Sequence, residues 1–211
     1  MNLTKLFQTQ AKLDERIMQE HPELRGQNNL DWKLLALQVE LGECANEWRG
    51  FKKWSKNQEP RTAVVNLCVT CQGTGDENYE TVTEDAESGC KHEFMKCEEC
   101  NGKGDIGFRN PLLEEYVDCL HFILSIGLEI NTKTTVDWDD IEFFETDITE
   151  QFIEITSRIL ELRSWESSNT WAGLFSEFYV LGKMLGFTWD EVETAYFTKN
   201  AENHRRQTNG Y

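Results

Sequence analysis

Two apolar helical segments of the chain each carry a pair of carboxylates three residues apart. Glu40 and Glu43 lie in LALQVELGECANEW, and Glu115 and Asp118 lie in NPLLEEYVDCLHFIL. Residues i and i+3 share one face of a helix, and four neighbouring carboxylates repel one another unless cations lie among them. Hard oxygen ligands favour Mg²⁺, or Mn²⁺, over zinc and copper. The spacing therefore predicts a helical scaffold with a carboxylate–Mg²⁺ centre, which suits phosphate-ester or anhydride chemistry.

Other interpretations of these carboxylates are weaker. A single ExxE pair most often marks a solvated helix face, but here two pairs occur within apolar helices. A di-iron carboxylate bundle requires two Glu-x-x-His pairs on facing helices. Only Asp118 and His121 approach that pattern. Magnesium remains the preferred ion.

Composition limits the class of protein. The chain has 211 residues with 39% hydrophobic content, enough for one sizeable domain with a modest insertion. Its formal net charge of -17 argues against a nucleic-acid-binding surface. No apolar run approaches 18 residues, and the amphipathic start is unlike a signal peptide. We expect a cytoplasmic protein that binds neither membrane nor nucleic acid.

Hydrophobic periodicity predicts an all-α fold. The expected helices cover about 3–20, 30–54, 111–129, 138–164 (one helix or a broken pair), 168–186 and 188–206. Asn29 and Asn110 are the expected N-caps of the second and third helices, and Thr188 with Glu191 forms a capping-box pattern for the last. The helical pattern of hydrophobic residues is lost between about Lys56 and Phe108. We expect a helical catalytic domain of residues 1–56 and 109–211, interrupted by an insertion of residues 57–108.

The insertion carries two near copies of a CxxCxGxG motif. Cys68 and Cys71 form the first pair, and Cys97 and Cys100 form the second. Two such turns place four thiolates for tetrahedral Zn²⁺, and their glycines permit tight turns. Cys90 and His92 are alternative ligands. The odd total of seven cysteines, without an export signal, argues against a disulfide framework.

Three blocks of this sequence together resemble a known family. LALQVELGECANEWRGFKKWS, LLEEYVDCLHFILSIGLE and AYFTKNAENHRRQTNGY are similar to the all-α dimeric dUTPases of the MazG-like nucleoside triphosphate pyrophosphohydrolases, in the branch of Gram-positive bacteria and their phages. The resemblance implies a MazG-like helical bundle that forms a homodimer. It also implies hydrolysis of dUTP by a metal-activated water, with dUDP as a further candidate substrate. The products from dUTP, dUMP and pyrophosphate, would serve nucleotide-pool sanitation and dTTP supply.

The resemblance assigns roles to particular residues. Its metal-binding positions correspond to Glu40, Glu43, Glu115 and Asp118, and Glu43 is the carboxylate expected to orient or deprotonate the water. Its phosphate-contacting positions are Lys199, Asn203, Arg206 and Tyr211. Taken alone, the basic residues would more simply complement a helix C-terminus.

The resemblance also places the uracil and deoxyribose. Gln10 is expected to pair with the base and Trp54 to stack on it, with Phe51 as the alternative stacking residue. His121 and Ser125 share a helix face beside the four carboxylates and are candidates for contact with the sugar, although such a histidine is more often a hydrogen-bonded core residue. Relatives often carry an asparagine shortly after the glutamine, whereas this chain has Leu13 and Asp14.

Two other functions remain open. One is hydrolysis of a different nucleotide by the same carboxylate site. The other is a protein-binding role in which the zinc module performs the function. Some phage-borne relatives carry variable insertions at this point and bind repressors of mobile genetic elements, so a phage-inducible island repressor is a candidate partner.

Overall fold

The computed structural model describes residues 3–132, 147–208 and 210. The chain forms two compact units. The helical unit comprises Met1–Pro60 with Leu112–Tyr211, and the insertion unit comprises Arg61–Pro111.

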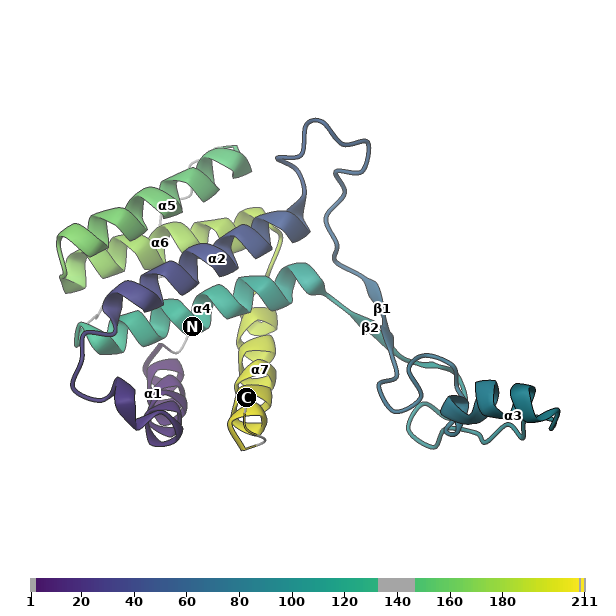
Figure 1. The fold of residues 1–211 in the computed structure, drawn as a ribbon. Helices are drawn as coiled ribbons and strands as arrows, with labels where there is room; N and C mark the ends of the chain where they lie inside the picture. Colours follow the sequence, from purple (N-terminus) through teal and green to yellow (C-terminus); the bar gives the residue numbers. More distant parts are fainter. Residues whose placement is uncertain (1–2, 133–146, 209, 211) are drawn as a thin grey trace. The chain divides into compact units, whose positions relative to one another are not determined.

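The helical unit is built from helices alone in its described part (Figure 1). Its elements are α1 (Leu3–Glu20), the 3-10 helix η1 (Pro22–Leu24), α2 (Leu30–Trp48), α4 (Pro111–Glu129), α5 (Ile148–Ser164), α6 (Ser168–Met184) and α7 (Trp189–Thr208). Helix α5 packs against α6 and α2, and α1 packs against α7. The predicted all-α class is confirmed. Among the described residues, no helix is long and apolar enough to cross a membrane.

Helix α4 lies in the core and is tied to α6 by polar contacts. Val117, Leu120 and Ile123 on α4 are fully buried. The Tyr116 hydroxyl donates to the Phe178 carbonyl at 2.9 Å, and the Trp171 indole donates to the Ile123 carbonyl at 2.8 Å. Because both side chains are buried, these bonds satisfy polar groups that would otherwise be costly to bury. These two hydrogen bonds fix the position of α4, and hence of its acidic residues, relative to α6.

Several predicted helix ends agree with the structure. Helix α1 has the expected bounds, and α4 begins at Pro111 and ends at Glu129. The capping box of α7 is present, since the Glu191 amide donates to the Thr188 hydroxyl at 3.3 Å and the Thr188 amide donates to the Glu191 carboxylate at 2.9 Å. Helix α5 ends at Ser164 as expected. The expected helical stretch from Trp138 to residue 146 lies outside the described residues.

The prediction for α2 was correct at its start, Leu30, and wrong at its end. The helix stops at Trp48 rather than near Trp54, because Arg49 adopts a left-handed conformation with φ 66°. The Trp48 ring lies against Gly50, where an added Cβ would be 2.3 Å from a ring carbon. At the other end, Asn29 precedes the helix but its side chain does not cap it. The Asn28 side chain instead accepts from the Leu30 amide at 2.8 Å.

The insertion unit contains a two-stranded antiparallel hairpin and a short helical excursion. Strands β1 (Val64–Leu67) and β2 (Asp105–Arg109) pair with Val65 opposite Phe108. Between them lie the 3-10 helix η2 (Tyr79–Thr81) and helix α3 (Val82–Ser88). Helix α3 was not predicted, because its seven residues carry no apolar stripe.

Candidate active site

Three of the four predicted metal-binding carboxylates converge between α2 and α4. Carboxylate oxygens of Glu40, Glu43 and Glu115 lie within 4.8 Å of one another. Burial raises the pKa of Glu40 and of Glu115 to about 7, and repulsion from Asp118 and Glu43 adds to the shift of both. Such a cluster is unfavourable when ionised unless a cation neutralises it. The residues therefore fit a hard divalent cation.

The fourth carboxylate has a different neighbour. Asp118 on α4 forms an ion pair with Lys199 on α7. Burial raises the pKa of Asp118, whereas the hydrogen bond and the charge of Lys199 oppose that shift. In this structure Lys199 supplies the positive charge that Asp118 requires.

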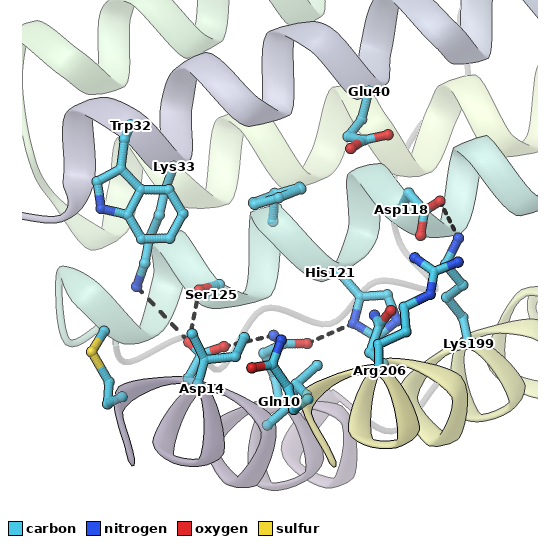
Figure 2. A pocket seen from close by; sticks show the side chains of 16 residues that line it. Gln10, Asp14, Trp32, Lys33, Glu40, Asp118, His121, Ser125, Lys199 and Arg206 are labelled. Atoms are coloured by element: carbon cyan, nitrogen blue, oxygen red, sulfur yellow. Dashed lines mark hydrogen bonds and ion pairs between the residues drawn. The ribbon is translucent and has the colours of Figure 1, made fainter. Parts of the chain in front are cut away.

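A cavity of about 310 Å³ runs from this acidic cluster along α1, α4 and α7. Figure 2 shows Asp118, Lys199 and Arg206 at one side, Trp32, Lys33 and Asp14 at the other, and Gln10 and His121 between them. The residues predicted from the sequence that line it are Gln10, Glu40, Asp118, His121, Ser125, Lys199, Asn203 and Arg206.

Two predicted stacking residues lie elsewhere. Trp54 does not line this cavity; it follows the end of α2, is 78% exposed and packs edge-to-face on Phe51. Phe51 lines a separate groove between α2 and α5. Trp32 and Phe122 supply aromatic surface in the cavity instead. The remaining phosphate-contacting candidate, Tyr211, lies outside the described residues.

His121 is held in the middle of the cavity wall. Its Nδ1 lies 2.8 Å from Oε1 of Gln10, and its ring stacks on Tyr196 with centroids 4.3 Å apart. Burial lowers the pKa of His121 to about 3, so the ring is neutral near pH 7. The Tyr196 hydroxyl also donates to Oε1 of Gln10, at 2.9 Å. Because an amide oxygen can only accept, Nδ1 of His121 carries the proton.

Two charged residues at the far end of the cavity were missed as site residues from the sequence. The Asp14 carboxylate accepts from Nε2 of Gln10 and from the Ser125 hydroxyl, both at 2.7 Å. Lys33 is 2% exposed, and its ammonium lies 2.7 Å from Glu129 and 3.9 Å from Asp14. Burial raises the pKa of Asp14, whereas the Ser125 hydrogen bond, the Lys33 charge and the Gln10 hydrogen bond lower it.

Both residues had a recognisable signal in the sequence. Asp14 follows Gln10 by four residues, which places the two on one face of α1. Lys33 occupies a position of the apolar pattern of α2, between Leu30 and Leu37. A lysine at such a position is rarely buried unless it is paired.

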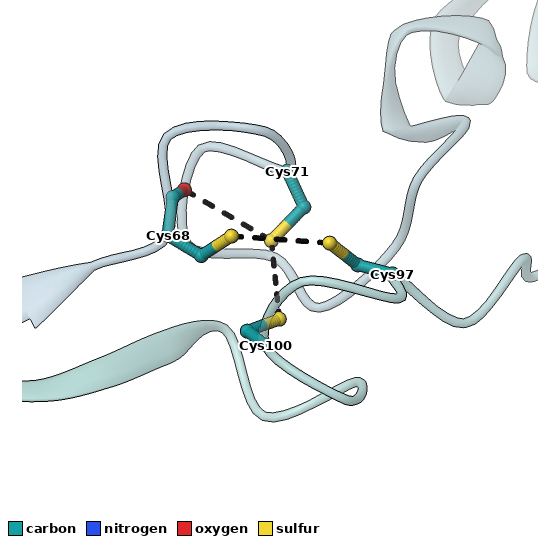
Figure 3. Close-up of side chains that lie close together, drawn as sticks. All are labelled: Cys68, Cys71, Cys97 and Cys100. Carbon is teal, nitrogen blue, oxygen red and sulfur yellow. Dashed lines mark hydrogen bonds between the residues drawn. The ribbon is translucent and has the colours of Figure 1, made fainter.

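In the insertion unit, all four predicted zinc-binding cysteines come together (Figure 3). The sulfurs of Cys68 and Cys97 are 3.8 Å apart, and those of Cys71 and Cys100 are 3.6 Å apart. Tetrahedral zinc with Zn–S bonds of about 2.3 Å requires sulfurs about 3.8 Å apart. The four side chains are buried and form no disulfide. They therefore fit a structural zinc ion.

Backbone amides complete this cluster. The Gly75 amide donates to Cys71 Sγ and the Gly104 amide donates to Cys100 Sγ, each at 3.2 Å. The two alternative ligands lie apart from the four sulfurs. Cys90 is exposed, and both ring nitrogens of His92 are engaged by the carboxylates of Asp76 and Asp85.

Comparison with known proteins agrees with this arrangement. A family model described as dUTPase matches residues 2–69 and 106–211. These ranges include the acidic cluster and the residues that line the cavity, and they omit residues 70–105 of the insertion. No curated protein and no solved structure matches the chain. Because the matched ranges cover most of the sequence, the chain belongs to the dUTPase family and is a dUTP diphosphatase.

Proposed function

We propose that the chain hydrolyses dUTP to dUMP and pyrophosphate in a Mg²⁺-dependent reaction. The observation that carries this proposal is the convergence of Glu40, Glu43 and Glu115 within 4.8 Å, beside a cavity that also presents Lys199 and Arg206. Anionic groups that can hold cations and cationic groups that can hold phosphate thus lie side by side. That combination is suited to positioning a polyphosphate for attack by water.

The metal would be held by Glu40, Glu43, Glu115 and Asp118. Bound there, Mg²⁺ supplies charge neutralisation on the phosphoryl oxygens and lowers the pKa of water. We assign to Glu43 the task of orienting the attacking water and accepting its proton. Glu43 is exposed, so water can reach its carboxylate.

Residues of α7 would hold the phosphates. Lys199 and Arg206 contribute two positive charges, and Asn203 contributes an amide donor. Because Lys199 pairs with Asp118 in this structure, we propose that it exchanges this carboxylate for a phosphate oxygen when Asp118 turns toward the metal. Tyr211 remains a proposed phosphate contact.

The nucleoside would occupy the other end of the cavity. Gln10 and His121 are buried there and joined by a hydrogen bond, so they present a rigid polar edge. Trp32 and Phe122 provide aromatic surface against which a pyrimidine can lie. We therefore propose Trp32, rather than the exposed Trp54, for the stacking role.

Substitution of the acidic cluster tests this proposal. Glu43→Gln should reduce dUTP hydrolysis at saturating Mg²⁺ by about 10²-fold or more, because it removes the group that accepts the proton. Glu166→Gln, in the exposed connection between α5 and α6, is the matched control and should leave the rate unchanged. Pyrophosphate release provides the measurement. Retention of full activity in Glu43→Gln would refute the assignment.

The main alternative is hydrolysis of another nucleotide at the same site. Parallel assays with dUTP, dUDP, dCTP, dTTP and UTP would distinguish the two possibilities. Equal turnover of all the triphosphates would mean that the cavity does not read the base or the sugar. It would leave the phosphate chemistry intact.

We also propose that the protein is a homodimer. Helix α2 exposes Trp32, Leu35 and Val39 along the face opposite its buried side, at 39%, 62% and 51% exposure. Such a stripe is typical of a surface that another protein covers. Because Trp32 also lines the cavity, a second copy on this stripe would border the site. Leu35→Glu should convert the dimer to a monomer in light-scattering measurements.

For the insertion unit we propose a structural Zn²⁺ and a docking role. The hairpin exposes Val65, Leu67, Ile106 and Phe108, between 46% and 75%. A two-stranded hairpin with uncovered apolar side chains is well suited to bind a protein partner, and a phage-inducible island repressor is our candidate. Phe108→Ser should weaken binding of purified repressor in calorimetry without changing dUTP hydrolysis. Unchanged binding would remove this role.

A further inference from the structure

The donors and acceptors at the nucleoside end of the cavity are fixed by their neighbours. Oε1 of Gln10 accepts from Nδ1 of His121 at 2.8 Å and from the Tyr196 hydroxyl at 2.9 Å, so both of its lone pairs are used. Nε2 of Gln10 donates one proton to Asp14 at 2.7 Å. An amide nitrogen has two protons. Gln10 can therefore offer a ligand only one donor.

Asp14 offers the opposite kind of group. Its Oδ1 accepts from Gln10 and its Oδ2 accepts from Ser125, each at 2.7 Å, while an ionised carboxylate has about four acceptor positions. The remaining capacity of Asp14 is therefore acceptor only. Figure 2 shows Asp14 and Gln10 adjacent on the cavity wall. Together they present one donor beside one acceptor.

That pair is complementary to two different pyrimidines. Uracil presents its N3–H donor beside a carbonyl acceptor, and cytosine presents its 4-amino donor beside its N3 acceptor. The two rings have the same size and shape. The Gln10–Asp14 pair by itself therefore does not exclude cytosine.

The charge of this end favours the amino group. Asp14 and Glu129 carry two negative charges, and the ammonium of Lys33 at 3.9 and 2.7 Å supplies one positive charge; His121 is neutral. The N3–H of uracil lies between two carbonyl oxygens, which a carboxylate repels. The amino group of cytosine has only one neighbouring acceptor. An amide in place of Asp14 would reverse this preference, since it can donate to a uracil carbonyl while accepting from N3–H.

We propose that the site also accepts deoxycytidine triphosphate, which it hydrolyses with water to dCMP and pyrophosphate, and that Asp14 is the residue that permits this second substrate. The inference rests on the proposed location of the base at this end of the cavity. It extends the substrate class from uracil to amino-pyrimidine deoxynucleotides.

The test compares base preference in the full-length protein and in Asp14→Asn. Calorimetry with the α,β-imido analogues of dUTP and dCTP, in the presence of Mg²⁺, measures binding without turnover. In the wild-type protein the two affinities should agree within about tenfold. In Asp14→Asn the ratio should move toward the uracil analogue by about tenfold or more. Asp190→Asn, an exposed substitution in α7, is the matched control and should leave the ratio unchanged.

The outcomes separate this inference from the proposed function. If wild-type protein hydrolyses dUTP but binds the cytosine analogue more than about 100-fold more weakly, the inference is refuted and dUTP hydrolysis stands. The same holds if the ratio does not respond to Asp14→Asn. If Asp14→Asn does not fold, as judged by circular dichroism, the wild-type affinities and dCTP hydrolysis decide alone. Failure of wild-type protein to hydrolyse dUTP would refute both.

Discussion

The cysteine cluster of the insertion unit and the acidic cluster of the helical unit each include four candidate metal-binding side chains, yet their surroundings differ. In the insertion unit, two pairs of cysteine sulfurs lie 3.8 and 3.6 Å apart, close to the separation that zinc requires, and glycine amides donate to two of the four sulfurs. In the helical unit, only three carboxylates converge, and Asp118 is paired with Lys199 instead. The first cluster is closed by its own backbone. The second is open and retains unfavourable charge.

This difference matches the role that we propose for each cluster. A structural zinc site gains most from rigid, complete coordination, because metal binding is then part of folding. A catalytic site has to leave room for substrate and water. Residual repulsion among Glu40, Glu43 and Glu115 is compatible with that role, since it makes the arrival of a cation favourable. Substitutions in either cluster can test this difference.

The largest expected effect is the loss of zinc from the insertion unit. Cys97→Ser removes one of the four proposed ligands, and the free energy of structural zinc binding is about 10–16 kcal/mol in small zinc domains. We expect the purified variant to have lost its stoichiometric zinc in elemental analysis, and residues 61–111 to become sensitive to protease. The matched control is Cys90→Ser, whose parent thiol is exposed and outside the cluster. Equal zinc loss in both variants would contradict the four-cysteine assignment.

A smaller effect is expected from the glycine turns behind the sulfurs. Gly75 has φ 78°, and a Cβ there would lie 2.4 Å from the Gly102 carbonyl oxygen. Gly75→Ala should therefore destabilise the insertion unit by about 2 kcal/mol or more. Gly89→Ala is a control for the backbone conformation alone, since Gly89 has φ 73° but no atom within 4 Å of its added Cβ. It should cost about 1 kcal/mol. Competition with a zinc chelator would show which of the two variants loses zinc more readily, and we expect it to be Gly75→Ala.

Substitution of Lys199 should change both metal binding and substrate binding at the acidic cluster. Replacing Lys199 by methionine releases Asp118 from its ion pair, which adds a fourth available carboxylate but removes a proposed phosphate contact. We expect Mg²⁺ to bind the free protein more tightly and the KM for dUTP to rise by about tenfold. Titration calorimetry with Mg²⁺ alone and steady-state kinetics separate the two effects. Weaker Mg²⁺ binding in the variant would show that Lys199 does not compete with the metal.

The remaining prediction concerns the pH dependence of stability without metal. The pKa of Glu40 and of Glu115 is raised from 4.5 to about 7 in the folded chain. Proton binding therefore favours the folded state, and this contribution is complete below about pH 4.5 and lost as the pH rises through about 7. The urea midpoint should be lower at about pH 8 than at about pH 5.5, and Mg²⁺ should restore it at the higher pH. In Glu40→Gln/Glu115→Gln the difference should shrink. If the urea midpoint of this double variant depended on pH as strongly as that of the wild-type protein, other groups would be responsible for the pH dependence.

Local signals in the sequence predicted much of the fold. The bounds of α1 and α4 and the capping box of α7 follow from periodicity and cap residues within a few positions of one another. The end of α2 was mispredicted because the apolar pattern continues past Trp48, while the left-handed Arg49 has no distinctive residue type. The four cysteines were recognised because the CxxC spacing and its glycines are themselves local.

The sequence by itself thus determined the helices, the two acidic pairs and the two CxxC pairs, since each depends on neighbours along the chain. Only the tertiary structure decided which side chains share the cavity. The contacts of Asp118 with Lys199 and of Asp14 with Ser125 join residues 81 and 111 positions apart. The orientation of the Gln10 amide depends on α4 and α7 at once. Such contacts arise from the packing of helices, and no spacing within one helix encodes them.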